Sequence, residues 1–399
     1  MSSPALRLEG MGDVAVKHSE AAADAAPPAA ATARAPATGG PLSPAHMLAL
    51  QGTAGNRAVG RMIAGLSIAR TISDDVFNVT QEINKAKPPD AALVKKAIDV
   101  AKLAYAEVQR LQTAKAGDDK IEEAYKDVYR VISALIQAGA DNAAIDFAKT
   151  CDATVQTGAL NAIRSYSGSG VEGIQTEAVR AGRLVGVTVA APTKGQSSAA
   201  WLEAQTEKIG ETYKKLESAG LKKLDNDPNS SLSLSFVSKM LAKYFTLSDT
   251  DVKPDPAGHV GKLKVGADNQ LEVDCDVYAT YATRLLRAAG WTTVGYMAIV
   301  PGEATGRDAH AVALAKRPGS GGKTDYVAVS DFMLKEFQAA DDDAARDPLL
   351  RHGLDIYSSK GEPSSWKAYY SPAGSGGTYD TKLIDPEKNG LSVYKSKGS

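Results

Sequence analysis

The stretch that most constrains the fold is residues 271–290, which read LEVDCDVYATYATRLLRAAG. Its first four residues alternate between apolar and charged side chains and predict a strand, and the following residues predict a helix that ends at Gly290. Asp274 is placed to cap this helix, so Cys275 falls on its first turn. Unpaired backbone N–H groups at a helix N-terminus favour an anion, which biases a thiol toward the thiolate. The sequence therefore predicts a reactive cysteine at the start of a helix.

Two further polar residues follow in strand-like runs. His310 lies within the apolar run 309–314, and Asp331 comes shortly after the apolar run 326–329. Adjacent antiparallel strands can place these two side chains next to each other, facing the helix that carries Cys275. A thiol, a base within hydrogen-bond reach of it and a group that orients the base make a catalytic triad. We therefore predict that Cys275, His310 and Asp331 are catalytic residues.

The pattern resembles the transglutaminase-like branch of the papain-like cysteine enzymes over roughly residues 232–340. The segments that carry the resemblance are DCDVYA at 274–279, LLRAAG at 285–290, AHA at 309–311 and VSD at 329–331. It implies an α+β fold in which the cysteine-bearing helix packs on an antiparallel sheet. It also implies that Cys275 is the nucleophile, that His310 is the general base and acid, and that Asp331 orients the imidazole. The family often has an aromatic residue two positions after its histidine, where this chain has Val312, and no side-chain oxyanion donor is evident.

Other interpretations of these residues are open. A cysteine on a helix or a histidine in an apolar strand is, taken singly, more often a core residue than a catalytic one. A zinc site built from Cys275, His310 and an aspartate would lack the paired ligand spacings usual for zinc. The carboxylates in residues 249–261 lack the spacing of a calcium loop, so no metal or other cofactor is expected. His259 and His352 stand in polar, turn-like surroundings and are predicted to be exposed.

Composition excludes several classes of partner. The 399-residue chain has 43% hydrophobic and 23% charged residues, which is ordinary for a protein with a core, and two or three domains are expected. A net charge of −1 gives no electrostatic reason to expect binding to nucleic acid or to an anionic membrane. No apolar run is long enough to cross a membrane, and no secretion signal is visible at the N-terminus. Two cysteines suit synthesis in a reducing cytoplasm.

The N-terminal part is composed differently. Residues 1–42 are rich in Ala and Pro and are predicted to be disordered, and residues 43–69 predict short helical turns around a break at Gly55. Within the latter, LQGTAGNRAV at 50–59 is similar to a short element near the N-terminus of many bacterial proteins associated with extracellular contractile injection systems. This resemblance implies a cargo or effector that is loaded into such a particle. A helix that simply packs on the following domain is the structural alternative.

Residues 70–226 predict a helical bundle, because apolar residues recur there in alternating steps of three and four. The stripes are Ile72, Val76, Val79 and Ile83; then Val94, Ile98, Ala101, Tyr105 and Val108; then Ile121, Tyr125, Val128, Ile132 and Leu135. A further helix over 143–155 would carry Cys151 on its apolar stripe, so we interpret Cys151 as a core thiol. Mixed-sign charges in this segment indicate solvated helix faces.

A polar turn cluster at 226–231 predicts the start of the C-terminal domain, residues 227–399. After Asp331, residues 332–337 predict the beginning of a helix. The last part of the chain predicts a loop-rich tail that aromatic side chains pin to the core, and the alternative is that these side chains line a substrate groove. These side chains are Trp366, Tyr369, Tyr370 and Tyr379.

Two hypotheses of different classes follow. The first is a cargo protein whose C-terminal domain attacks a carboxamide or peptide carbonyl of a protein target through a thioester on Cys275. Hydrolysis is favoured over transamidation, and a cell-wall peptide endopeptidase is the nearest enzymatic alternative. The second is a structural or binding component of the particle whose papain-like domain has lost its chemistry.

Overall fold

The computed structural model describes residues 56–221, 231–302, 309–372 and 393–395, apart from 249–251, 254, 256, 267, 268, 332 and 361–364. Residues 1–64 and residues 65–399 form two compact units. The predicted disordered segment 1–42 and the first part of the motif at 50–59 lie outside the described residues. From Asn56 onward the motif belongs to a single helix, α2 (Asn56–Lys85), which continues without a break past residue 69.

The predicted helical bundle is present. Its helices after α2 are α3 (Ala91–Thr113), α4 (Asp118–Gln137), α5 (Asp141–Ala148), α6 (Ala153–Tyr166), α7 (Gly170–Leu184) and α8 (Ser198–Ser218). The three predicted stripes pack in the core, with Val79, Val108 and Val128 fully buried. Burial of these stripes supplies the hydrophobic stabilisation that isolated helices of this length lack.

The predicted helix over 143–155 is two helices. The carboxylate of Asp152 accepts hydrogen bonds from the backbone N–H groups of Thr154 and Val155 and so starts α6. Cys151 lies in the link between α5 and α6, where its thiol donates to the carbonyl oxygen of Phe147 at 3.5 Å. Burial raises the pKa of the Cys151 thiol to about 11. The interpretation of Cys151 as a core thiol is confirmed.

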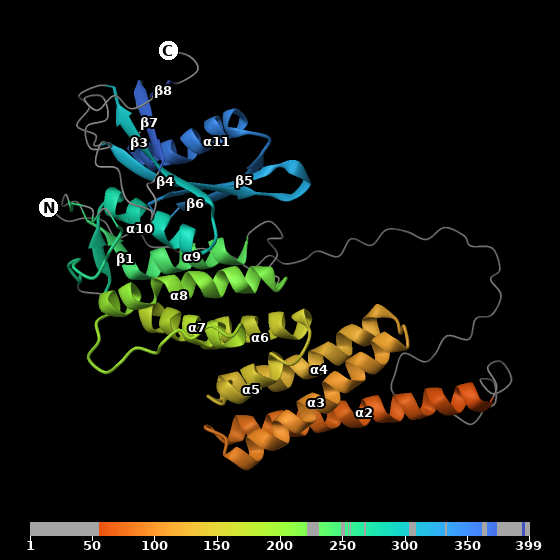
Figure 1. Ribbon diagram of the computed structural model, residues 1–399. Helices are drawn as coiled ribbons and strands as arrows, with labels where there is room; N and C mark the ends of the chain where they lie inside the picture. The colour runs from red at the N-terminus through yellow and green to blue at the C-terminus, as the bar shows by residue number, and fades with distance from the viewer. Residues whose placement is uncertain are drawn as a thin grey trace, which may run out of the picture. The chain divides into compact units, whose positions relative to one another are not determined.

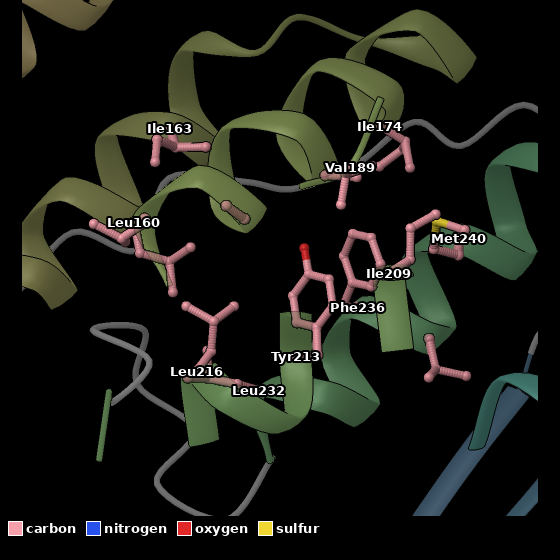
Figure 2. Close-up of a cluster of buried hydrophobic side chains, with 14 of the residues drawn as sticks. Leu160, Ile163, Ile174, Val189, Ile209, Tyr213, Leu216, Leu232, Phe236 and Met240 are labelled. Atoms are coloured by element: carbon pink, nitrogen blue, oxygen red, sulfur yellow. The ribbon is translucent and has the colours of Figure 1, made fainter. Parts of the chain in front are cut away.

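The bundle and the C-terminal part share one core. Helix α9 (Leu232–Tyr244) starts at the cap Ser231 and packs against α7 and α8. Figure 2 shows side chains of α6, α7, α8 and α9 meeting in one apolar cluster, in which the rings of Tyr213 and Phe236 are stacked with centroids 3.5 Å apart. The fully buried carboxylate of Glu177 on α7 pairs with Arg164 of α6 and with Lys239 of α9. The predicted boundary near residue 226 therefore does not separate two independent cores.

The C-terminal part is α+β, as predicted. Its described strands form a six-stranded antiparallel sheet in the order β6-β5-β4-β3-β7-β8. The strands are β3 (Thr293–Pro301), β4 (His310–Pro318), β5 (Thr324–Ser330), β6 (Met333–Ala339), β7 (Trp366–Pro372) and β8 (Val393–Lys395). Two short strands, β1 (Phe245–Leu247) and β2 (Leu271–Val273), form a separate parallel pair ahead of the cysteine-bearing helix.

Two expectations for the C-terminal part were wrong. Residues 333–339 are a strand, β6, whose Phe337 ring stacks on Tyr326 of β5 with centroids 5.6 Å apart. An apolar pattern over so few residues fits both a helix and a strand, and the strand forms because these residues pair with β5. Trp366 and Tyr370 belong to β7, which pairs with β3 along its whole length and is not a tail. Tyr379 lies outside the described residues.

Helices cover both faces of this sheet. The cysteine-bearing helix α10 (Cys275–Ala288) packs against β3, β4 and β5 on one face, where Ala311 and Ala313 of β4 join its core. Helix α11 (Asp342–Leu354) packs on the opposite face against Met297, Ile299 and Val312, and a 3-10 helix (Asp355–Lys360) follows it. The two helices appear on opposite sides of β4 in Figure 1. The sheet thus has two buried faces, and the direction of each side chain decides which helix it meets.

Candidate active site

Cys275 occupies the predicted place at the start of α10. One carboxylate oxygen of Asp274 accepts a hydrogen bond from the N–H of Val277 at 3.0 Å, which caps the helix, and the other accepts from the N–H of Val252 at 2.8 Å. The helix is followed by Gly290 in the left-handed conformation, with φ +96°. These features follow from local sequence, and they fix the position of the thiol.

The sulfur of Cys275 lies against the beginning of β4. Its Sγ is 4.0 Å from the carbonyl oxygen of Ala309 and 3.8 Å from Oδ1 of Asp276. The backbone N–H of Ala311 acts to lower the pKa of the thiol. Ala309 and Ala311 flank His310, so the thiol lies beside the backbone of His310 on the α10 side of the sheet.

The thiolate bias predicted for Cys275 is not found. Burial, together with the nearby carboxylates of Asp276, Asp331 and Asp274, raises the pKa of the Cys275 thiol to about 12. The backbone N–H of Ala311 acts in the opposite direction but is outweighed. The positive end of the helix is likewise offset by its own capping carboxylate. In this arrangement the group is a neutral thiol at physiological pH.

His310 lies on the other face of the sheet from α10. Its register partner on β3 is Ile299, which packs in the α11 cluster together with Val312. The imidazole is 5% exposed, and its Nε2 lies 2.6 Å from the hydroxyl oxygen of Ser330, which is fully buried. The expectation that His310 faces the cysteine-bearing helix was therefore wrong.

The reason is the alternation of side chains along a strand. Ala311 faces α10, so its neighbour His310 points to the opposite face. A change of one residue in strand register would reverse both directions. Sequence alone gives the strand but does not give this register.

The surroundings of His310 keep the imidazole neutral. Burial, together with His352 on α11, lowers its pKa to about 4. His352 was predicted to be exposed but is buried, with Nε2 3.3 Å from the carbonyl oxygen of Met333 and Nδ1 3.8 Å from Asp355. His259 is 55% exposed, as predicted.

Asp331 lies beside His310. It follows β5 in the left-handed region, with φ +36°, and its Oδ2 is 3.9 Å from Nδ1 of His310. Its Oδ1 is buried with no hydrogen-bond partner. Burial, together with the charge of Asp274, raises the pKa of Asp331 to about 6. An unpaired buried carboxylate oxygen on a strained residue is a common sign of a functional site.

The structure thus brings together two of the three predicted residues directly and the third indirectly. His310 contacts Asp331, and Sγ of Cys275 lies 4.0 Å from the carbonyl oxygen of Ala309, the residue before His310. None of the hydrogen bonds among the described residues joins Sγ of Cys275 to the imidazole. Sequence reasoning missed Ser330 as the partner of Nε2, although Ser330 directly precedes Asp331 at the end of a strand.

Further comparisons do not identify the chain. Over the described part of the chain, no group of three or more His, Cys, Asp or Glu side chains is placed to hold a metal ion. Among the same residues, no helix is both long and apolar enough to span a membrane. Family models, curated proteins and solved structures were compared with the sequence and the fold, and none of them matches.

Proposed function

We propose that this chain is a cysteine hydrolase that cleaves a peptide or side-chain amide of a protein target, and that it is carried as cargo by a bacterial contractile injection system. The observation that supports the chemistry is the position of Cys275 Sγ, which lies 4.0 Å from the carbonyl oxygen of Ala309, next to His310, while Asp331 lies 3.9 Å from the imidazole. The residues that we propose as nucleophile, base and orienting carboxylate therefore lie near one end of β4.

This arrangement is a resting state, because the imidazole of His310 lies on the α11 face of the sheet and the thiol of Cys275 lies on the α10 face. His310 is the first residue of β4, so it can turn to the α10 face by giving up its pairing with Ile299 and its bond to Ser330 while the rest of the strand stays in register. On the α10 face a ring nitrogen meets the thiol and takes its proton. The resulting imidazolium lowers the pKa of Cys275, and the carboxylate of Asp331 stabilises the positive ring.

The reaction then follows the chemistry of an activated thiol. The thiolate of Cys275 attacks the carbonyl carbon, and the electron pair of the C=O bond moves to oxygen, where the backbone N–H of Cys275 supplies one stabilising donor. Collapse breaks the C–N bond and forms a thioester, and the leaving amine takes the proton held by His310. Water, deprotonated by the same imidazole, attacks the thioester and releases the acid and the thiol. An amine in place of water would give transamidation.

Labelling of the thiol tests this proposal without a known substrate. We would measure the rate at which iodoacetamide modifies Cys275 between pH 6 and pH 10, in a Cys151→Ala background. Ser330→Ala removes the hydroxyl that holds the imidazole on the α11 face, so we expect it to accelerate labelling at pH 7 at least tenfold. Adding His310→Ala to that variant is expected to return the rate to its slow value, because no base remains.

Equal rates in all of these variants, with labelling rising only above pH 9, would instead identify a non-catalytic component of the particle. Two observations favour that second candidate: the raised pKa of Cys275 and the buried bond between His310 and Ser330. A cell-wall peptide endopeptidase is distinguished by incubation with purified peptidoglycan. Release of new amino groups by the Ser330→Ala protein, but not by Ser330→Ala combined with Cys275→Ala, would establish that activity.

The particle association rests on the resemblance of residues 50–59, of which 56–59 begin α2. We propose that this segment directs loading. Replacement of Gln51, Thr53 and Arg57 by alanine is expected to abolish co-purification with assembled particles while leaving the yield and the unfolding transition of the chain unchanged. Retention of the variant at the level of the unaltered chain would remove the support for loading through this segment.

A further inference from the structure

We propose that a cavity between α11 and the sheet is a binding site for a small, uncharged aromatic ring. The cavity has a volume of about 100 Å³. Helix α11 lies on the face of the sheet away from α10, as Figure 1 shows, so the cavity is separate from the thiol of Cys275. The proposal does not depend on the chemistry at Cys275.

The lining of the cavity is partly buried and apolar and partly exposed and polar. Met297 of β3 is 2% exposed, Leu314 of β4 is 8% exposed and Leu350 of α11 is 5% exposed. The side chains of Asp342 and Lys316, which form what we call the open end, are 69% and 34% exposed. A ligand can therefore place an apolar group against the buried side chains while its other end reaches solvent.

The volume of the cavity suits a ligand with a single six-membered ring. An enclosed apolar cavity of about 150 Å³ lined by Leu, Ile and Phe stays dry and binds benzene. The present cavity is of the same order and is lined on its inner side by Met and Leu side chains, with the ring of Tyr370 alongside. A six-membered ring fits this volume, whereas a fused bicyclic ring requires more space.

The open end selects an uncharged ligand. Nζ of Lys316 lies 2.7 Å from both carboxylate oxygens of Asp342, and the hydroxyl of Tyr326 donates to Oδ1 of Asp342 at 2.7 Å. The ammonium and the carboxylate therefore satisfy each other, and Nε of Arg346, which also lines the cavity, lies 3.8 Å from Oδ1 of Asp347. A charged ligand would have to compete with this pair, while an uncharged ring leaves it intact.

Nuclear magnetic resonance tests the proposal through Met297. The intact protein, labelled with ¹³C at the methionine methyl groups, would be titrated with toluene, benzoate and benzylamine. We expect toluene to give a saturable ring-current shift of the Met297 methyl signal, and we expect both charged compounds to bind at least tenfold more weakly. Capped phenylalanine amide, tested in parallel, shows whether the ring can belong to a peptide: a shift with it indicates a side chain of a partner, and a shift with toluene alone indicates a free small molecule.

Two substitutions at Leu349, which lines the cavity on α11, change its volume in opposite directions. Leu349→Phe fills the space and is expected to weaken toluene binding at least tenfold. Leu349→Ala enlarges it and is expected to make indole bind more tightly than it binds the unaltered protein. Ala344→Phe adds a ring at an exposed position of the same helix and is expected to leave toluene binding unchanged. An absence of a saturable Met297 shift up to the solubility of toluene, or equal toluene affinity in Leu349→Phe, would overturn the proposal.

Discussion

The imidazole Nε2 of His310 lies 2.6 Å from the hydroxyl oxygen of Ser330, and both side chains are buried on the α11 face of the sheet. This bond occupies one ring nitrogen, while the other faces Asp331 at 3.9 Å. The hydrogen bond between His310 and Ser330 therefore holds the imidazole on the α11 face. It stabilises the fold and holds the proposed base away from the thiol.

Ser330→Ala should cost about 1–3 kcal/mol of unfolding free energy, because it leaves a buried ring nitrogen without a partner. His310→Leu in combination with Ser330→Ala should cost less than the two single substitutions added together, since neither polar group is then left unpaired. Urea unfolding at pH 7 measures both effects. Ser218→Ala, at an exposed helix position, is the control and should change the free energy by less than about 0.5 kcal/mol. Strict additivity of the two core substitutions would show that the bond contributes little.

Asp331→Asn should stabilise the protein at neutral pH. The pKa of Asp331 is raised to about 6, above its ordinary value near 3.8, so the fold disfavours the charged form. The loss of unfolding free energy caused by the charged Asp331 carboxylate is absent below pH 4 and grows between pH 4 and pH 6. Above pH 6 it reaches its full value of about 3 kcal/mol. Asparagine tolerates the left-handed backbone at this position. We expect a gain of up to about 3 kcal/mol at pH 8 and no gain at pH 4.

Asp331→Asn also reveals how the titration of His310 affects the stability of the fold. The pKa of His310 is lowered to about 4 from an ordinary value near 6.5, so the folded state loses stability as pH falls through this window. In the unaltered protein, protonation of Asp331 stabilises the folded state as the pH falls through nearly the same range. The effects of Asp331 and His310 on the free energy of unfolding therefore oppose each other. The fall in stability between pH 7 and pH 4 should therefore be about 3 kcal/mol larger in Asp331→Asn than in the unaltered chain. Urea unfolding at half-unit pH steps gives the two curves, and parallel curves would contradict the assignment.

The part of the site that could be predicted is the part that local sequence determines. Capping by Asp274, the helical period of the following residues and Gly290 fix the place of Cys275, and all three act within one segment. The proximity of His310 and Asp331 follows from two adjacent strands. These features need no knowledge of the rest of the chain.

The direction of His310 could not be predicted, because it depends on a single residue of register set by pairing between β3 and β4. The raised pKa of Cys275 could not be predicted either, since its largest cause is burial, which tertiary packing determines. The helix predicted to begin at residues 332–337 is a strand for a similar reason: β6 is defined by pairing with β5. Tertiary contacts decided each of these features.

Asp276→Asn should lower the pKa of Cys275. After burial, the charge of Asp276 is the largest cause of the raised pKa, and the carboxylate oxygen lies 3.8 Å from the sulfur. Removing that charge should move the pH dependence of iodoacetamide labelling downward by about one unit, in a Cys151→Ala background. Glu272→Gln is the control, because Lys264 pairs with Glu272 and Glu272 is not among the causes of the shift at Cys275. An unchanged labelling curve in Asp276→Asn would show that burial alone governs the thiol.

Gly210→Ala should destabilise the bundle and the sheet together. Gly210 lies on α8 where it meets α10, and a Cβ at this position would be 2.5 Å from the backbone carbonyl carbon of Ala288. Alanine normally favours a helix by about 1 kcal/mol, but relief of this overlap requires the two helices to separate, for which we expect a net loss of about 1–3 kcal/mol. Gly117→Ala is the matched control, since nothing lies within 4 Å of a Cβ there.

The measurement for Gly210→Ala is urea unfolding followed by circular dichroism, which reports mainly on the helices, and by the fluorescence of Trp291, which is buried beside α10. Trp201→Phe and Trp366→Phe would remove the other two tryptophans. Because α8, α9 and α10 share one core with the sheet, we expect both signals to show a single transition that shifts to lower urea by the same amount. Two transitions, with only the first shifted, would mean that the bundle and the cysteine-bearing sheet unfold separately and that α8 does not stabilise the position of Cys275.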